Sequence, residues 1–254
     1  MTRFIRIIIT CSFLGSLLFS ACVQTWESII PAETATLLPS LTPTVTPLPV
    51  ITAIPSHTLV IPDSGWEQLR PGLERRVINL FSESGVQVEH LYLLRVEPVH
   101  YQFGVAYHQE PQSLDAWQLE TNALILVNGG YFRARDNGTY IPNGLTVVDG
   151  VAMGNSYESF AGMLAVTNDG PELRWLAQKP YDPDEPLLAA LQSFPLLVKP
   201  GGEIGFPEEY EDYLQARRTV IGQDRSGRII LIIASKGYFT LHQLSVYLTG
   251  SDLD

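Results

Sequence analysis

The distribution of proline divides this chain into a proline-rich segment, in which regular secondary structure is disfavoured, and a remainder that is expected to fold. Between residues 33 and 62, proline alternates with threonine, leucine, valine and serine. Proline fixes φ and removes a backbone donor, so both helix and sheet are disfavoured there. The composition predicts an extended, semi-rigid tether of about 3 Å per residue. We therefore expect the globular domain over residues 64–254.

The residues before the tether predict an export signal. Arg3 and Arg6 form a short basic region, and an apolar stretch follows over residues 7–19. That stretch is too short to span a bilayer comfortably as a helix. Small residues then lead to Cys22, a pattern that is typical of a secretory signal.

The cysteine that ends this signal predicts a lipid anchor. The residues before Cys22 resemble a lipobox, with Phe19 in place of the usual aliphatic residue. We expect a lipoprotein signal peptide over 1–21, lipidation at Cys22, and a tether over 22–63 that holds an extracytoplasmic domain at the cell membrane or envelope. The alternative is an ordinary signal peptide with an incidental cysteine. We expect Cys11 to be removed with the signal and Cys22 to be acylated, so that the mature domain has no disulfide and no thiol chemistry.

Charge and composition narrow the classes of partner. The net charge is −11, and 45% of the residues are hydrophobic. The hydrophobic content is adequate for a buried core. The acidic excess argues against nucleic acid, whose phosphate backbone requires clustered lysine and arginine. It does not exclude a small sugar phosphate, because one or two local arginines can hold a phosphate group.

Hydrophobic periodicity predicts an α+β fold, with a mixed β-sheet core and flanking helices. A helix from Thr240 is indicated by a capping box with Gln243, and Gly250 is placed to end it. Further helices are expected over 111–121 and 186–192. Strands are expected over 86–96, 101–107, 123–127, 145–153 (a hairpin), 163–167, 173–176, 195–198, 219–222 and 228–234.

The end of one predicted strand carries the most informative polar group. The apolar run over 123–127 leads into Asn128, Gly129, Gly130 and Tyr131. Paired glycines allow a sharp turn and a close approach of the backbone to a ligand. The Asn128 amide can donate and accept hydrogen bonds at once, as a sugar hydroxyl requires, and Tyr131 can stack on a sugar ring or fill the core. The alternative is a turn that only ends the strand.

Four segments, in order along the chain, resemble the motifs of the phosphodiester glycosidase family. That family includes the enzyme that uncovers mannose 6-phosphate by removing N-acetylglucosamine, and bacterial proteins described as exopolysaccharide biosynthesis factors. Phe194 stands where the family usually has glycine. The resemblance spans roughly residues 87–254, and the four segments are 128–132, 142–150, 192–198 and 218–222.

The resemblance implies hydrolysis of the glycosidic bond in a sugar-phosphate diester of an envelope or exported glycan. It implies a substrate-binding set of Asn128, Gly129, Gly130, Tyr131, Gln192, Ser193 and Arg218. Arg218 is the candidate for the phosphate, because a guanidinium presents paired donors in a fixed fork. Its alternative is an ion pair with a nearby carboxylate among Glu208, Glu209, Glu211 and Asp212. Gln192 and Ser193 either donate neutral hydrogen bonds to the ligand or shape a turn before Pro195.

The family's second hallmark, Asn-Leu-Asp-Gly-Gly, is not reached before Asp254. We expect a chain truncated before that motif, and no general acid or base is assigned. The histidines show no metal-ligand spacing, so we expect no metal site and no cofactor, with a divalent cation left open. The competing functions are a non-catalytic glycan-binding surface lipoprotein, and a structural lipoprotein whose tether is the functional part.

Overall fold

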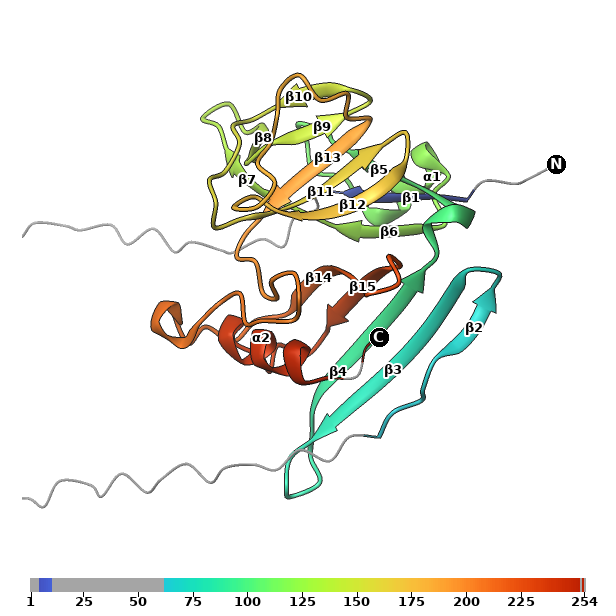
Figure 1. Cartoon of the computed structure of the whole chain (residues 1–254), viewed down its shortest axis with the longest axis vertical. Helices are drawn as coiled ribbons and strands as arrows, with labels where there is room; N and C mark the ends of the chain where they lie inside the picture. The colour runs from blue at the N-terminus through green and yellow to red at the C-terminus, as the bar shows by residue number, and fades with distance from the viewer. Residues whose placement is uncertain (1–4, 11–61, 252, 254) are drawn as a thin grey trace, which may run out of the picture. The chain divides into compact units, whose positions relative to one another are not determined.

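The computed structural model describes residues 5–10, 62–251 and 253 (Figure 1). The predicted lipidation at Cys22 and almost all of the predicted tether lie outside these residues. Within the described ranges strands dominate and two α-helices accompany them, which confirms the predicted α+β class. The strands form one three-stranded, two five-stranded and one two-stranded sheet among the described residues.

The first five-stranded sheet is antiparallel and has the strand order β14-β15-β4-β3-β2. Its strands are β2 (Glu67–Arg70), β3 (Leu73–Phe81), β4 (Gln87–Val96), β14 (Arg218–Gln223) and β15 (Ile229–Ala234). Side chains alternate between the two faces of a strand. Ile229 and Leu231 therefore enter one apolar cluster, while Ile230 and Ile232 enter another on the opposite face. Because an apolar cluster covers each face of the sheet, every residue of β15 is apolar.

The second five-stranded sheet is also antiparallel and has the order β10-β9-β13-β11-β12. Its strands are β9 (Thr146–Val148), β10 (Val151–Met153), β11 (Gly162–Thr167), β12 (Gly170–Trp175) and β13 (Ala189–Ser193). Asp149 and Gly150 join β9 to β10 with φ values of 48° and 79°. Two successive positive φ angles are those of the hairpin turn that the sequence predicts.

The three-stranded sheet is parallel and has the order β5-β1-β6 (Figure 1). Its strands are β1 (Ile5–Thr10), β5 (Tyr101–Ala106) and β6 (Ile125–Asn128), and the small remaining sheet pairs β7 (Tyr131–Ala134) with β8 (Tyr140–Asn143). The central strand β1 comes from the residues that the sequence assigns to the export signal. Whether these residues are removed stays a prediction.

The two α-helices begin at side-chain caps. Helix α2 (Leu241–Gly250) begins at Thr240, whose hydroxyl accepts from the backbone N–H of Gln243 while the Gln243 side chain accepts from the Thr240 N–H. The predicted capping box and the end at Gly250 are confirmed. Helix α1 begins at Leu114 and ends at Thr121, so it starts three residues inside the predicted range, and Ser113 is its cap. Short 3₁₀ turns occupy Pro98–His100 and Glu208–Tyr210.

Two sequence expectations are wrong, and strands β1, β2, β3, β7 and β8 were not expected. Residues 186–192 were expected to be a helix, but Ala189–Ser193 forms β13, because pairing with β9 and β11 on both sides buries it in the sheet. Residues 195–198 form no strand and contribute one isolated bridge, Val198 to Ile204. Strand β3 was not expected because its charged residues interrupt the apolar alternation.

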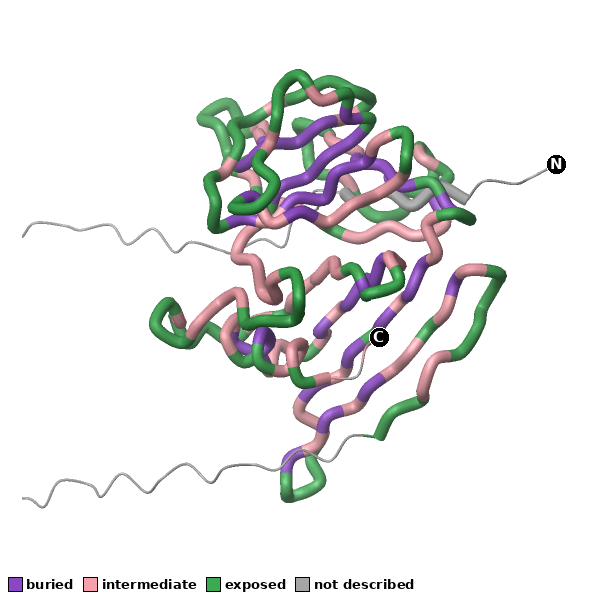
Figure 2. Tube along the Cα trace, in the orientation of Figure 1, coloured by how far each residue is buried: buried purple, intermediate pink, exposed green. Residues whose placement is uncertain are grey.

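Three apolar clusters hold these layers together, and Figure 2 shows buried positions running along β4 and β15 and through the centre of the second sheet. One cluster joins β3, β4 and β15 to β5, β11 and β13. A second packs α2 through Leu244 onto the opposite face of β4 and β15. The sheets that carry the candidate site residues are therefore joined by a continuous core.

Candidate functional site

One cavity of about 610 Å³ brings together segments from several sheets. The turn between β6 and β7, the residues after β13, the start of β14, and part of α2 line it. Asn128 and Arg218 are both among the lining residues. Two residues that are 90 positions apart in the sequence thus line the same cavity, while their roles in binding stay predictions.

A direct hydrogen bond connects the two strands that supply these residues. The Thr219 hydroxyl donates to Oδ1 of Asn128 at 2.7 Å, across 91 positions of sequence. This contact fixes the Asn128 side chain at the end of β6 and uses its acceptor oxygen. The amide –NH₂ of Asn128 is the group left for a ligand acceptor. No sequence pattern singles out Thr219, although it directly follows the arginine.

The glycines after Asn128 turn the chain into β7. Gly130 has a φ of 66°, in the left-handed region that a residue with a Cβ rarely adopts. The turn places Tyr131 at the cavity, where its hydroxyl donates to the carbonyl of Phe194 at 3.0 Å. The two rings lie 4.7 Å apart between centroids. Gly129, Gly130 and Tyr131 all line the cavity, as does Phe194.

The aromatic contact continues beyond the cavity. Phe194 packs edge-on against Tyr157 at 5.1 Å and against Phe160 at 5.7 Å. Phe160 is 54% exposed and Tyr131 is 40% exposed. Half-exposed aromatic rings beside a polar group are the usual platform for a sugar ring, which offers both C–H groups and hydroxyls. Tyr157 and Phe160 carried no sequence signal that marked them as site residues.

Arg218 enters the cavity with unused donor capacity. Its Nη2 donates to the carbonyl of Leu214 at 2.8 Å. Its Nε is a buried donor for which the described residues supply no acceptor. No carboxylate in the described ranges forms an ion pair with it. Of the acids near it in sequence, Glu211 instead accepts from the Thr240 hydroxyl and from the backbone N–H of His242.

The electrostatics of Tyr131 place Arg218 in its neighbourhood. Burial raises the pKa of the Tyr131 hydroxyl, and the positive charge of Arg218 opposes that rise. Burial likewise raises the pKa of Tyr157, and Tyr131 adds to the effect. Both phenols are therefore neutral donors at neutral pH. Arg217, the neighbour of Arg218, is exposed and does not line the cavity.

Gln192 and Ser193 occupy different environments. The Gln192 side chain is buried, and its Oε1 accepts from the backbone N–H groups of Tyr157 at 2.7 Å and Leu145 at 3.3 Å. Its Nε2 donates to the Ser156 hydroxyl at 2.8 Å. Gln192 therefore ties two loops together and is absent from the cavity lining, whereas Ser193 is exposed and lines it. Substrate contact by either residue stays a prediction.

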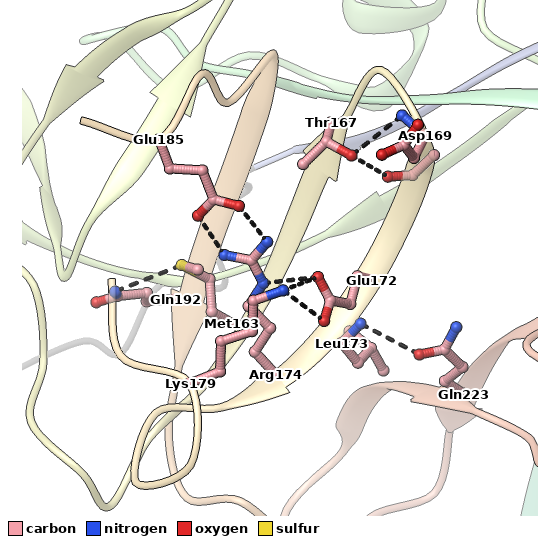
Figure 3. A network of polar contacts seen from close by, with 11 residues as sticks. Met163, Thr167, Asp169, Glu172, Leu173, Arg174, Lys179, Glu185, Gln192 and Gln223 are labelled. Atoms are coloured by element: carbon pink, nitrogen blue, oxygen red, sulfur yellow. Dashed lines mark hydrogen bonds and ion pairs between the residues drawn. The ribbon is translucent and has the colours of Figure 1, made fainter. Parts of the chain in front are cut away.

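A buried ion-pair network supports one wall of the cavity (Figure 3). Arg174 of β12 donates from both terminal nitrogens to Glu185 at 2.6 Å and from Nε to Glu172 at 2.9 Å. Hydrogen bonding by Arg174 lowers the pKa of Glu185. The backbone N–H of Leu173 donates to Oε1 of Gln223 at 3.3 Å, which links β12 to β14. The Arg174 guanidinium is thus committed to structure.

The remaining charges along the cavity favour an anion. Lys199 and Arg225 join Arg218 among the lining cations, and the Lys199 ammonium lies 5.5 Å from the Trp175 ring centroid. The carboxylate that lines the cavity is Asp224. Its Oδ2 accepts from Nε of Arg228 at 2.6 Å, so its charge is compensated. The cavity therefore offers net positive charge within an acidic protein.

Within 5–10, 62–251 and 253, no group of three or more histidine, cysteine, aspartate or glutamate side chains is placed to hold a metal ion. No helix in the same part of the chain is both long enough and apolar enough to cross a membrane.

Comparison with known proteins identifies a family whose matched region contains most of the residues that line the cavity. A search of curated proteins finds no match. The family model described as phosphodiester glycosidase matches residues 121–252, just over half of the chain. The match includes the turn after β6, the residues after β13 and all of β14. This match supports a glycosidase-type function with a carbohydrate substrate. The chain belongs to the phosphodiester glycosidase family.

Proposed function

We propose that the protein hydrolyses the glycosidic bond of a sugar-phosphate diester in an envelope or exported glycan. The observation that carries this proposal is the position of Arg218, a cation with a buried unpaired donor in the same cavity as Asn128. A guanidinium beside neutral hydrogen-bonding groups and aromatic rings matches a ligand that is partly phosphate and partly sugar.

The phosphate is expected at the Arg218 end of the cavity. A buried donor without an acceptor is costly, by about 1–3 kcal/mol for a neutral group and more for a charged one. A phosphate oxygen supplies that acceptor and the opposite charge together. Lys199 adds positive charge around the same cavity, and the lining carboxylate Asp224 is already paired with Arg228.

The sugar is expected against the turn that follows β6. The Asn128 amide, whose oxygen is held by Thr219, directs its –NH₂ group to a sugar oxygen. The face of Tyr131, with Phe194 packed beside it, provides the apolar surface for the C–H groups of the ring. The bond between the anomeric carbon and the phosphate oxygen is then expected to lie between Asn128 and Arg218.

The reaction breaks that bond and leaves its oxygen with the phosphate. Water supplies hydroxyl to the anomeric carbon and a proton to solvent, so the products are the free sugar and a phosphomonoester. Negative charge develops on the departing phosphate, and a fixed cation placed beside it stabilises the transition state more than the ground state. Arg218 is the residue that supplies this charge.

The test uses a hexose 1-(methyl phosphate) diester with the wild-type chain and two variants. Arg218→Ala is expected to lower kcat/KM about 100-fold or more, as loss of one transition-state donor does elsewhere. Arg217→Ala is the matched control, because it removes the same charge from an exposed neighbour, and it is expected to retain activity. Equal losses in the two variants, or no free sugar from the wild-type chain, contradict the proposal.

A second candidate is glycan binding without turnover. Glycoside hydrolysis commonly uses two carboxyl groups, whereas the described cavity lining contains Asp224, which is already paired with Arg228. Equilibrium binding of the same diester separates the two functions. Saturable binding that Arg218→Ala weakens, with no release of sugar over many hours, assigns the binding function. Release of sugar assigns the hydrolase.

We further propose that the domain works outside the cytoplasm on a lipid anchor at Cys22. The support is the sequence pattern before that residue. Metabolic labelling with a fatty-acid analogue is expected to mark the wild-type protein and not Cys22→Ser. Labelling of the variant, or a soluble wild-type protein without label, contradicts the anchor.

A further inference from the structure

The parallel sheet depends entirely on its central strand. β1 pairs with β5 at six positions, from Ile5 with Tyr101 to Thr10 with Ala106. It pairs with β6 at four positions, ending at Thr10 with Asn128. Neither β5 nor β6 has another strand partner among the described residues. Residues 5–10 are therefore one partner in every strand-to-strand hydrogen bond of this sheet.

The space between β5 and β6 is held open by the core. Neighbouring strands lie about 4.8 Å apart, so strands on either side of a third are separated by roughly 10 Å. β5 cannot move to close that distance, because Tyr101, Phe103 and Val105 are buried in the central apolar cluster. The Tyr101 hydroxyl also donates to the carbonyl of Pro71 at 2.7 Å. Ile125 and Val127 hold β6 against the same cluster.

This space has the properties of a binding site for a strand. Its two edges present unpaired backbone N–H and C=O groups when β1 is absent, which is the arrangement that binds an extended peptide by strand addition. The occupant is parallel to both neighbours, and its sequence is IRIIIT. The occupant ends beside Asn128, which lines the cavity.

We propose that the space between β5 and β6 is an acceptor site for one extended, apolar peptide strand, which residues 5–10 fill, and that filling it holds Asn128 in the cavity. The same residues lie in the predicted export signal, so removal of residues 1–21 empties the site. Strand insertion and export then compete for one segment. This inference concerns the sheet and does not depend on which reaction the cavity performs.

The experiment keeps the full chain and cuts it after folding. A site-specific protease sequence is inserted between residues 40 and 50, and the folded protein is cleaved there. The N-terminal fragment is expected to elute together with the domain on size exclusion. Mild denaturant followed by dialysis removes the fragment, and a synthetic peptide of residues 1–13 is then added back.

Amide hydrogen exchange measures whether the site between β5 and β6 is filled. Removal of the fragment is expected to speed exchange in β5 and β6 by about tenfold or more, while β15 stays protected and shows that the domain remains folded. The peptide is expected to restore protection, and the same peptide with Ile8→Pro, which lacks one backbone donor, is not. A fragment that elutes alone after cleavage, unchanged exchange after its removal, or equal rescue by the proline peptide overturns the proposal.

Discussion

The sheet that supplies Asn128 and the sheet that supplies Arg218 are built in different ways. The β14-β15-β4-β3-β2 sheet is antiparallel, joins the β14–β15 hairpin to the consecutive strands β2, β3 and β4, and is covered on both faces by apolar clusters. The β5-β1-β6 sheet is parallel and depends on one strand from a distant part of the chain. The Thr219–Asn128 hydrogen bond joins the two. The cavity therefore has a self-sufficient wall, the β14-β15-β4-β3-β2 sheet, and a dependent wall, the β5-β1-β6 sheet, which requires β1.

The largest expected effect tests the self-sufficient wall. Leu93 of β4 is 1% exposed and packs in the cluster beneath α2. Leu93→Ala is expected to lower the free energy of unfolding by about 2–5 kcal/mol, since it removes buried methyl groups and leaves a cavity. Urea denaturation checks this, with Val86→Ala, exposed in the adjacent turn, as a control within about 0.5 kcal/mol. Equal effects would show that this sheet is not the stable one.

The next effect tests the ion-pair network beside β14. Glu185→Ala removes both acceptors of the terminal nitrogens of buried Arg174, while Glu172 remains. The expected loss is about 1–3 kcal/mol, because a buried charged donor loses its partner. Thermal denaturation measures this loss, and Glu110→Ala, at an exposed position, serves as the control. A loss no larger than that of the control would mean that the network adds nothing to the wall.

A smaller effect tests the joint between the two sheets. Thr219→Val removes the hydroxyl that holds Asn128 at 2.7 Å. The expected cost is about 0.5–1.5 kcal/mol of stability, together with weaker binding of the sugar diester. Thr139→Val removes a similar bond, 2.7 Å long, to Asn137, which does not line the 610 Å³ cavity. The control is expected to leave binding unchanged, and equal binding by both variants would rule out a positioning role for Thr219.

The smallest effect concerns acid and the loop before β14. Burial alone raises the pKa of Glu211, but hydrogen bonds from Thr240 and the His242 backbone outweigh it, so the pKa lies below the usual 4.5. A lowered pKa stabilises the fold above about pH 4.5, and the contribution disappears as the pH falls through the folded-state pKa. Glu211→Gln is expected to lower Tm at pH 7 and to match the wild type more closely near pH 3. A constant difference across that range contradicts this assignment.

The sequence predicted the elements with strong local patterns. The β14–β15 hairpin and the capped helix α2 follow from a turn signal between apolar runs and from the Thr240–Gln243 box. The helix predicted over residues 186–192 was wrong, because the periodicity of a short apolar run does not distinguish a strand from a helix. Pairing with β9 and β11 makes this segment a strand. The role of residues 5–10 as a strand is likewise set by distant partners.

The site was predictable in part for the same reason. Asn128, Gly130 and Arg218 stand at strand ends in recognisable motifs, and the structure gathers them at one cavity. Gln192 belongs to a motif too, but its environment is fixed by backbone N–H groups 35 and 47 positions away. Thr219 and Lys199 become visible only when tertiary structure brings them beside the cavity.

The residues that line the cavity are dispersed over the sequence, so the complete site forms only when the domain is folded. Its lining extends from Val127 to Leu253, so a proteolytic piece or a partly folded chain lacks at least one wall. A compound that binds only the folded state raises the free energy of unfolding by about 2.7 kcal/mol at a concentration a hundredfold above its Kd, and the melting temperature rises as a result. Thermal-shift screening of sugar phosphates is therefore a direct way to find the natural carbohydrate.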